Sequence, residues 1–284
     1  SGRNGGFCCL PAAKMSVQKM IRKYGLEATK EFWAAQLDGM DYLREIAGVE
    51  DISMDNQGDG NFEVAHRPEA FQGLKDYGRM LTDLFGIPTE IYGPDEFPAV
   101  GFQSQEQHGA LLIKAGFAIH PLKLALGLGS AAARHGARLH PMSEVSDWRK
   151  DGGKHLLQLA DGASVRANKV IVATNGFTRE RLHTGFDRRL MPVLSNIIVT
   201  RPLSADELQG QSWKTENPIC NTRNLLFYFR MLPGNRFMIG ARGDLTGRPA
   251  DGERMRREMT RRMGEAWEAA QKLAELRQPS RPVT

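Results

Sequence analysis

The sequence is poor in cysteine. Its 284 residues include three cysteines, Cys8, Cys9 and Cys220, which leaves one thiol over from any set of disulfide pairs and supplies no C-x-x-C motif. This usage favours a reducing compartment, and we expect a cytoplasmic protein. The adjacent Cys8 and Cys9 are either a redox pair or two small apolar residues, and the second role is the more common one for a free cysteine.

The sequence also lacks long hydrophobic runs and a large charge of one sign. No stretch approaches the about 18 uninterrupted apolar residues of a membrane helix, so we expect a soluble protein without a membrane span. The 38 Lys and Arg exceed the 33 Asp and Glu by five, which is too little to require nucleic acid as a partner. The arginines between 254 and 262 suggest nucleic acid by charge alone, and a solvated helix face explains them as well.

What is present is the composition of a folded protein, with 41% hydrophobic and 25% charged residues, and a length that fits two domains or one large one. Apolar residues recur at steps of three and four from 15 to 47, which predicts two helices that are broken near Gly25. Two further helices are predicted, at 69–84 before Gly86 and at 122–135 between Pro121 and Gly136. The stretch 250–277 has a helical composition.

Short alternating segments between turn residues predict strands at 60–65, 137–140, 145–149, 156–159, 164–167, 197–200, 224–231 and 237–240. The turn Pro233-Gly234-Asn235 predicts a hairpin between the last two. The β-branched run Val170-Ile171-Val172-Ala173 predicts a strand that is buried on both faces of a sheet. It ends in the turn Thr174-Asn175-Gly176, and open α/β sheets bind ligands at such strand ends. A helix is expected to begin at Arg179-Glu180-Arg181.

Four blocks stand in order along the chain. They are Ser1-Gly2-Arg3-Asn4-Gly5-Gly6, the segment His120-Pro121 before a helix, the run from Lys169 to Gly176, and the hairpin from Tyr228-Phe229-Arg230 to Ile239-Gly240-Ala241-Arg242-Gly243. Together they resemble the D-amino-acid oxidase superfamily of FAD-dependent oxidoreductases, and especially its gamma-glutamylputrescine oxidoreductase-like branch. The resemblance extends to about Trp267.

The resemblance implies an α+β or α/β fold in which an incomplete, Rossmann-like FAD-binding domain is interleaved with a strand-rich substrate domain. We expect the FAD-binding domain at 1–50 and 117–190, the substrate-binding sheet at 51–116 and 191–249, and a C-terminal helix and tail at 250–284. Two parts of the family pattern are missing from the sequence, the G-x-G-x-x-G unit and a last glycine-rich flavin loop. We therefore expect FAD to be held weakly or not at all, with apolar faces exposed beside the missing strand.

The implied cofactor is FAD, and the implied reaction oxidises the C–N bond of a small amine or amino acid. A hydride passes to flavin N5, and the imine that remains is hydrolysed. Gamma-glutamylputrescine is the nearest substrate guess, and the sequence leaves oxidase and dehydrogenase equally open. The alternative is a non-catalytic fragment that binds a ligand or partner without stable FAD.

The resemblance also assigns site residues. Exposed amides in the glycine-rich loop suit a cofactor, as do small residues in a turn beside it. The expected cofactor-binding residues are Gly2, Arg3, Asn4, Gly5, Gly6, Val145, Ala173, Thr174 and Gly176. The expected substrate-binding residues are Tyr228, Arg230 and Arg242, whose aromatic ring and guanidinium groups could receive a carboxylate. Each assignment has a purely structural alternative. The glycine-rich segment could be an ordinary loop, Val145 could be a core residue, and the strand residues could form surface ion pairs with Asp or Glu. His120 is either a base or a helix cap, and we expect the cap. The reaction needs no side chain as acid or base and the catalytic residues stay unassigned, while no metal ligand is expected.

Overall fold

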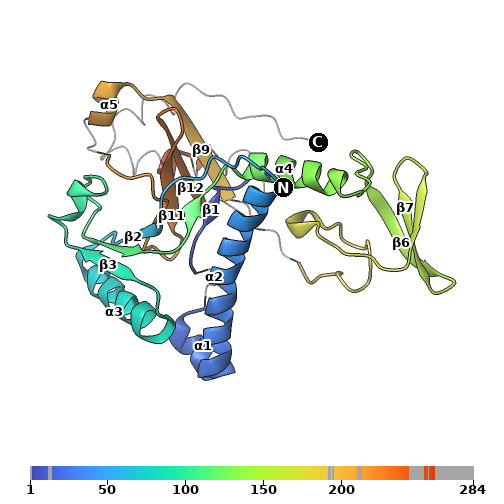
Figure 1. Cartoon of the computed structure of the whole chain (residues 1–284), viewed down its shortest axis with the longest axis horizontal. Helices are drawn as coiled ribbons and strands as arrows, with labels where there is room; N and C mark the ends of the chain where they lie inside the picture. Colours follow the sequence, from blue (N-terminus) through green and yellow to red (C-terminus); the bar gives the residue numbers. More distant parts are fainter. Residues whose placement is uncertain are drawn as a thin grey trace.

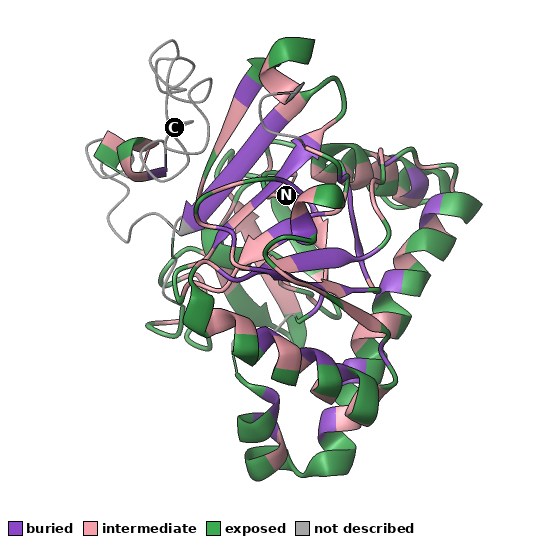
Figure 2. Ribbon diagram, turned by 90° about the vertical axis from the view of Figure 1, so that its left-hand side faces the viewer, coloured by how far each residue is buried: buried purple, intermediate pink, exposed green. Residues whose placement is uncertain are grey.

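A computed structural model describes residues 2–11, 15–190, 193, 195–209, 213–242, 253–254 and 256–259, with Gln209 and Arg242 described by their backbone only. Helices and loops surround a seven-stranded sheet, and a smaller sheet extends from one side (Figure 1). Buried residues gather on the strands of the large sheet and on the inward sides of the helices (Figure 2). None of the described helices is long and apolar enough to cross a membrane.

The helices follow the sequence pattern closely. They are α1 (Val17–Tyr24), α2 (Leu26–Val49), α3 (Pro68–Phe85), α4 (Pro121–Arg134) and the short α5 (Ala205–Gln209). Gly25 separates α1 from α2, and Gly86 ends α3 in the left-handed conformation, so the predicted boundaries are confirmed. His120 caps α4, because its Nδ1 accepts a hydrogen bond from the Lys123 backbone N–H at 3.3 Å.

The large sheet has the order β3-β4-β2-β10-β11-β12-β9. Its strands are β2 (Asn61–Val64), β3 (Thr89–Tyr92), β4 (Ala110–Ile113), β9 (Ser195–Pro202), β10 (Ile219–Asn221), β11 (Phe227–Leu232) and β12 (Arg236–Arg242). Only β2 and β10 run parallel among the described neighbours in this sheet. The predicted hairpin is confirmed, because β11 and β12 pair antiparallel around the turn at 233–235.

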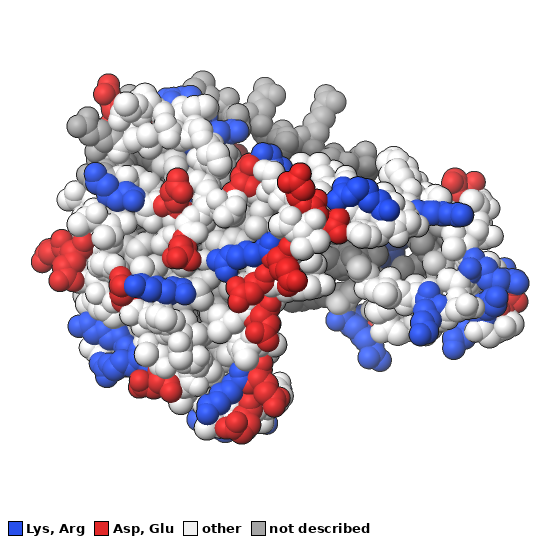
Figure 3. Space-filling model, viewed as in Figure 1, with Lys and Arg blue, Asp and Glu red and all other residues white. Residues whose placement is uncertain are grey.

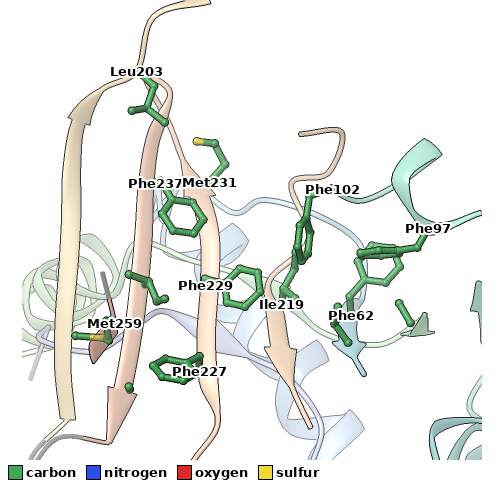
Figure 4. Packing of buried hydrophobic residues seen from close by; sticks show 14 residues of the cluster. Phe62, Phe97, Phe102, Leu203, Ile219, Phe227, Phe229, Met231, Phe237 and Met259 are labelled. Atoms are coloured by element: carbon green, nitrogen blue, oxygen red, sulfur yellow. The ribbon is translucent and has the colours of Figure 1, made fainter. Parts of the chain in front are cut away.

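Alternation along these strands divides the core between the two faces of the sheet. One face carries an aromatic cluster that includes Phe62, Phe229 and Phe237 (Figure 4). The other face, on the β4 side, packs Leu111 and Ile113 with residues of α2 and α3 such as Trp33. Tyr228 and Arg230 alternate with the clustered phenylalanines of β11, so they lie on the face opposite the aromatic cluster.

Two smaller sheets complete the described fold. The strand β1 (Phe7–Cys8) pairs antiparallel with β5 (Phe117–Ala118), which brings the glycine-rich loop to the start of α4. The strands β6 (Val145–Asp151), β7 (Lys154–Leu159) and β8 (Ser164–Ala167) form an antiparallel meander beyond α4. This meander and the loops after it, residues 137–190, form a projection at the right of Figure 1 that we call the arm.

Three local predictions are wrong. Residues 137–140 form no strand, and Arg179–Arg181 lies in turns rather than in a helix. The run Val170–Ala173 is coil, and Ile171 is 92% exposed. A strand that is buried on both faces needs neighbours to receive its backbone hydrogen bonds, and no described strand pairs with this run. Short runs 97–99 and 175–177 are 3-10 turns, and most of the expected helix at 250–277 lies outside the described residues.

Candidate active site

The glycine-rich loop of residues 2–6 packs closely against the rest of the chain. A Cβ atom on Gly6 would lie 2.1 Å from the Ile119 carbonyl oxygen, and the φ of Gly6 is +71°. A Cβ on Gly2 would lie 2.5 Å from the Cα of Leu122, in the first turn of α4. Each position therefore needs glycine, and the loop lies over both the start of α4 and the end of β5.

Tyr228 forms the side of this site that β11 contributes. A Cβ on Gly5 would lie 2.8 Å from the ring of Tyr228, and the Phe7 ring meets the same ring edge to face at 5.4 Å. The Tyr228 hydroxyl lies 2.7 Å from the Ser195 hydroxyl, and the ring lies over Gly240, its partner on β12. Burial raises the pKa of Tyr228, so the phenol stays protonated near neutral pH.

Arg230 lies beside Tyr228 but is turned into the protein, and it is 3% exposed. Its guanidinium donates to the Gly5 carbonyl at 3.2 Å, to the Ile119 carbonyl at 2.7 Å and to the Gln57 side-chain oxygen at 3.2 Å. The loop, β5 and β11 therefore meet at one buried cation.

The loop keeps hydrogen-bond donors available for a ligand. The Asn4 side-chain oxygen accepts from the Gly6 backbone N–H at 2.8 Å, which forms a tight turn. Within the described part of the chain, the backbone N–H groups of Arg3 and Gly5 make no hydrogen bond, and neither residue is buried. Amides in such a turn suit a carbonyl-rich or anionic group, so the loop fits one portion of a flavin cofactor.

The other predicted site residues lie elsewhere. Val145 begins β6 in the arm and pairs with Leu159. Ala173, Thr174 and Gly176 are exposed, and the hydrogen bonds of their turn are local, such as that between the Thr174 and Thr178 hydroxyls at 2.6 Å. Arg242 ends β12, and its side chain lies outside the described residues. The structure thus joins the glycine-rich loop to Tyr228 and Arg230, and among the described residues no hydrogen bond or ring contact links this group to Val145 or to the turn.

The sequence analysis missed the residues that hydrogen-bond to Arg230 and Tyr228 from distant parts of the sequence. Gln57 precedes Arg230 by 173 residues and Ser195 precedes Tyr228 by 33 residues, and neither belongs to a recognisable motif. Their role depends on strand order, which no local pattern specifies.

A half-buried polar row also escaped the sequence analysis. Cross-strand pairing places Glu63, Cys220, Tyr228 and Gly240 side by side across four strands. Desolvation raises the pKa of Glu63 to about 7 and that of Cys220 to about 12. The Glu63 carboxyl makes no hydrogen bond or ion pair with the described residues, and the nearby Tyr77 hydroxyl is buried without a partner among them. The one sequence feature that could have indicated this row is the carboxylate of Glu63 within the strand-like segment at 60–65. No described group of His, Cys, Asp and Glu could hold a metal ion.

Comparison with known proteins identifies relatives over most of the chain. Gamma-glutamylputrescine oxidoreductase of Escherichia coli (strain K12) is 28% identical over 252 residues, which cover 84% of this chain and 55% of the relative. Probable oxidoreductase OrdL of Haemophilus influenzae is 25% identical over 257 residues, covering 85% and 56%. The chain thus spans about half the length of the curated relatives it matches.

Solved structures agree on the fold. Glycine oxidase from Geobacillus kaustophilus superimposes with a TM-score of 0.64 at 18% identity, covering 95% of this chain and 70% of that one. This likeness confirms the expected α+β fold with a mixed sheet. The family model described as "DAO: FAD dependent oxidoreductase" matches residues 1–282, which confirms FAD as the cofactor of the family. The chain therefore belongs to the DAO family of FAD-dependent oxidoreductases.

Proposed function

We propose that the protein oxidises the C–N bond of a small amine or amino acid, with an N-substituted amine of the gamma-glutamylputrescine kind as the first substrate to test. The observation that carries the proposal is the meeting of the glycine-rich loop with Tyr228 on one face of the sheet. The similarity to gamma-glutamylputrescine oxidoreductase and to glycine oxidase supports an amine or amino-acid substrate.

In this proposal the chain supplies orientation rather than an acid or base. The free amides of Arg3 and Gly5 hold part of the flavin, with Gly2, Asn4 and Gly6 shaping the loop around them. The aromatic ring of Tyr228, fixed by Phe7 and Ser195, forms the wall against which the substrate lies. Bound FAD supplies the hydride acceptor. We also retain, as proposals, Val145 and the turn at 173–176 for other parts of the cofactor, Arg242 for the substrate, and the domain division given above.

The direct test is turnover of a substrate panel by the purified chain supplemented with FAD. The panel contains gamma-glutamylputrescine, putrescine, glycine and sarcosine, and both ammonia and reduced acceptor are measured, with dioxygen and an artificial dye as alternative acceptors. We expect oxidation of at least one amine, and Tyr228→Ala should reduce kcat/KM by about tenfold or more. A chain that binds FAD but oxidises no amine in the panel contradicts the proposed substrate class.

A second candidate, a ligand-binding or partner-binding fragment without stable FAD, is favoured by one observation. The run expected at the centre of the nucleotide-binding sheet is exposed coil, with Ile171 92% exposed. Flavin that elutes separately from the protein in gel filtration, with no quenching of its fluorescence on mixing, would select this candidate. Flavin that stays with the protein selects the oxidoreductase.

A further inference from the structure

Arg230 connects three segments that are distant in sequence. Its three hydrogen-bond partners, on Gly5, Gln57 and Ile119, are separated from it by 225, 173 and 111 residues. The same segments bind one another, because the Ile119 N–H donates to the Gly6 carbonyl at 2.8 Å and Gln57 exchanges two backbone hydrogen bonds with Ala118. Arg230 therefore lies at the point where all three meet.

The hydrogen-bond acceptors of the buried Arg230 guanidinium are neutral oxygen atoms. Its acceptors are two backbone carbonyls and one side-chain amide, and no described carboxylate forms an ion pair with it. Burial lowers the pKa of Arg230 to about 10, which leaves the group charged at neutral pH. A planar guanidinium can donate to three differently placed acceptors at once, whereas a lysine ammonium is a single point with no fixed fork.

The position leaves little room for a substrate. Arg230 is 3% exposed, and a Cβ on Gly6 would lie 3.0 Å from its Nη2 atom, so the loop itself covers the guanidinium. A carboxylate that took both prongs of the fork would have to displace the Gly5 and Ile119 carbonyls. The Ile119 carbonyl would then be buried without a donor.

We infer that Arg230 is a positioning residue that fixes the cofactor loop at 2–6 against the sheet, and that it does not receive a substrate carboxylate as the sequence resemblance suggests. The inference rests on the proposed function, because it concerns the same site. By holding the loop in one conformation, Arg230 keeps the Arg3 and Gly5 backbone N–H groups in place for the cofactor.

The test compares Arg230→Lys and Arg230→Met with Arg236→Lys in the full chain. Arg236 is a matched control, because it lies on the same hairpin and donates to the Thr200 carbonyl at 3.0 Å, away from the loop. Amide hydrogen exchange of residues 2–8 is measured by mass spectrometry without FAD. We expect faster exchange of this segment in both Arg230 variants, most in Arg230→Met, and unchanged exchange in the control.

Two solution measurements separate positioning from substrate binding. In FAD titrations followed by flavin fluorescence, both Arg230 variants should bind about tenfold or more weakly, because neither replacement can make the three hydrogen bonds of the guanidinium. In steady-state assays, any rise in KM should be equal for glycine and for putrescine, since only glycine carries a carboxylate. A KM rise confined to glycine, with FAD affinity and loop exchange unchanged, overturns the inference.

A second variant covers the case in which the Arg230 replacements do not fold. Gly6→Ala places a methyl group against the Ile119 carbonyl that Arg230 binds, so it disturbs the same contact from the loop side. It should also expose residues 2–8 to exchange and weaken FAD. Normal exchange in Gly6→Ala overturns the inference. Wild-type protein that shows a protected loop but binds no FAD contradicts the proposed function while leaving the positioning role supported.

Discussion

At the scale of single residues, Glu63 is the clearest departure from ordinary packing. It is a carboxyl group on a central strand with no described partner, and desolvation raises its pKa from 4.5 to about 7. The folded state then binds a proton that the unfolded chain has already released. The free energy of unfolding should therefore decrease as pH rises from about 4.5 to about 7 and should be level above that range.

The variant Glu63→Gln should remove this dependence. Because it cannot ionise, we expect it to be more stable than wild type at pH 8, by at most about 3 kcal/mol, and similar at pH 4.5. Urea unfolding at several pH values measures the difference, with the exposed Glu27→Gln as control. Parallel curves for Glu63→Gln and wild type would show that the carboxyl group is solvated in the folded state.

Gly240 controls the position of the Tyr228 ring. A Cβ there would lie 2.1 Å from the ring, so Gly240→Ala must displace the aromatic wall of the proposed site. We expect a loss of about 2 kcal/mol in unfolding free energy, as for other overpacked core positions. Gly39→Ala is the control, because a methyl group at that helical position meets nothing and should stabilise by about 0.5 to 1 kcal/mol. Equal stability of the two variants would contradict the ring placement.

At the scale of elements, the sequence predicts helices better than strands. The breaks at Gly25 and Gly86 are local steric signals, and both helix ends follow them. The β-branched run at 170–173 carries an equally strong strand signal but has no neighbour to pair with. Strand formation depends on a partner that is distant in sequence, whereas a helix satisfies its hydrogen bonds within itself.

The same distinction explains the candidate site. The glycine-rich loop and the Tyr-x-Arg strand could be recognised as short motifs, and the structure brings them into contact. Gln57 and Ser195, which hold Arg230 and Tyr228, could not be predicted, because register across the sheet decides their position.

Hydrogen exchange can test whether the run at 170–173, which has the sequence pattern of a strand, is coil in solution. The amides of Val170, Ile171 and Val172 should exchange at nearly unprotected rates, because no described strand receives them. The β7 amides of Leu156 and Leu157, which lie between β6 and β8, serve as the protected reference. Protection of the 170–172 amides equal to that of β7 would mean that the run pairs in solution.

At the scale of the whole molecule, the arm carries much of the net positive charge and the most exposed apolar side chains of the described residues. Residues 137–190 contain ten Lys and Arg against six Asp and Glu, a net +4 of the chain's +5, and basic side chains dominate that end of Figure 3. Met142, Ile171 and Phe177 are at least 80% exposed there.

Replacing that apolar surface should improve solution behaviour without loss of stability. The double variant Ile171→Thr and Phe177→Ser should change the unfolding free energy by less than about 0.5 kcal/mol, because both side chains face water. Sedimentation velocity should show less self-association. As a buried comparison, Ile113→Thr should cost about 2 kcal/mol or more. A large stability loss in the double variant would show that the arm packs against something in solution.

The contacts of Arg230 also set an order of events during synthesis. The loop is translated before β11, and the side chain that binds its Gly5 carbonyl follows 225 residues later. Contacts of such long range are slow to form and late in folding. Until β11 has been synthesised, the Gly5 carbonyl therefore has no Arg230 donor, so this anchor of the loop forms only after that strand is present.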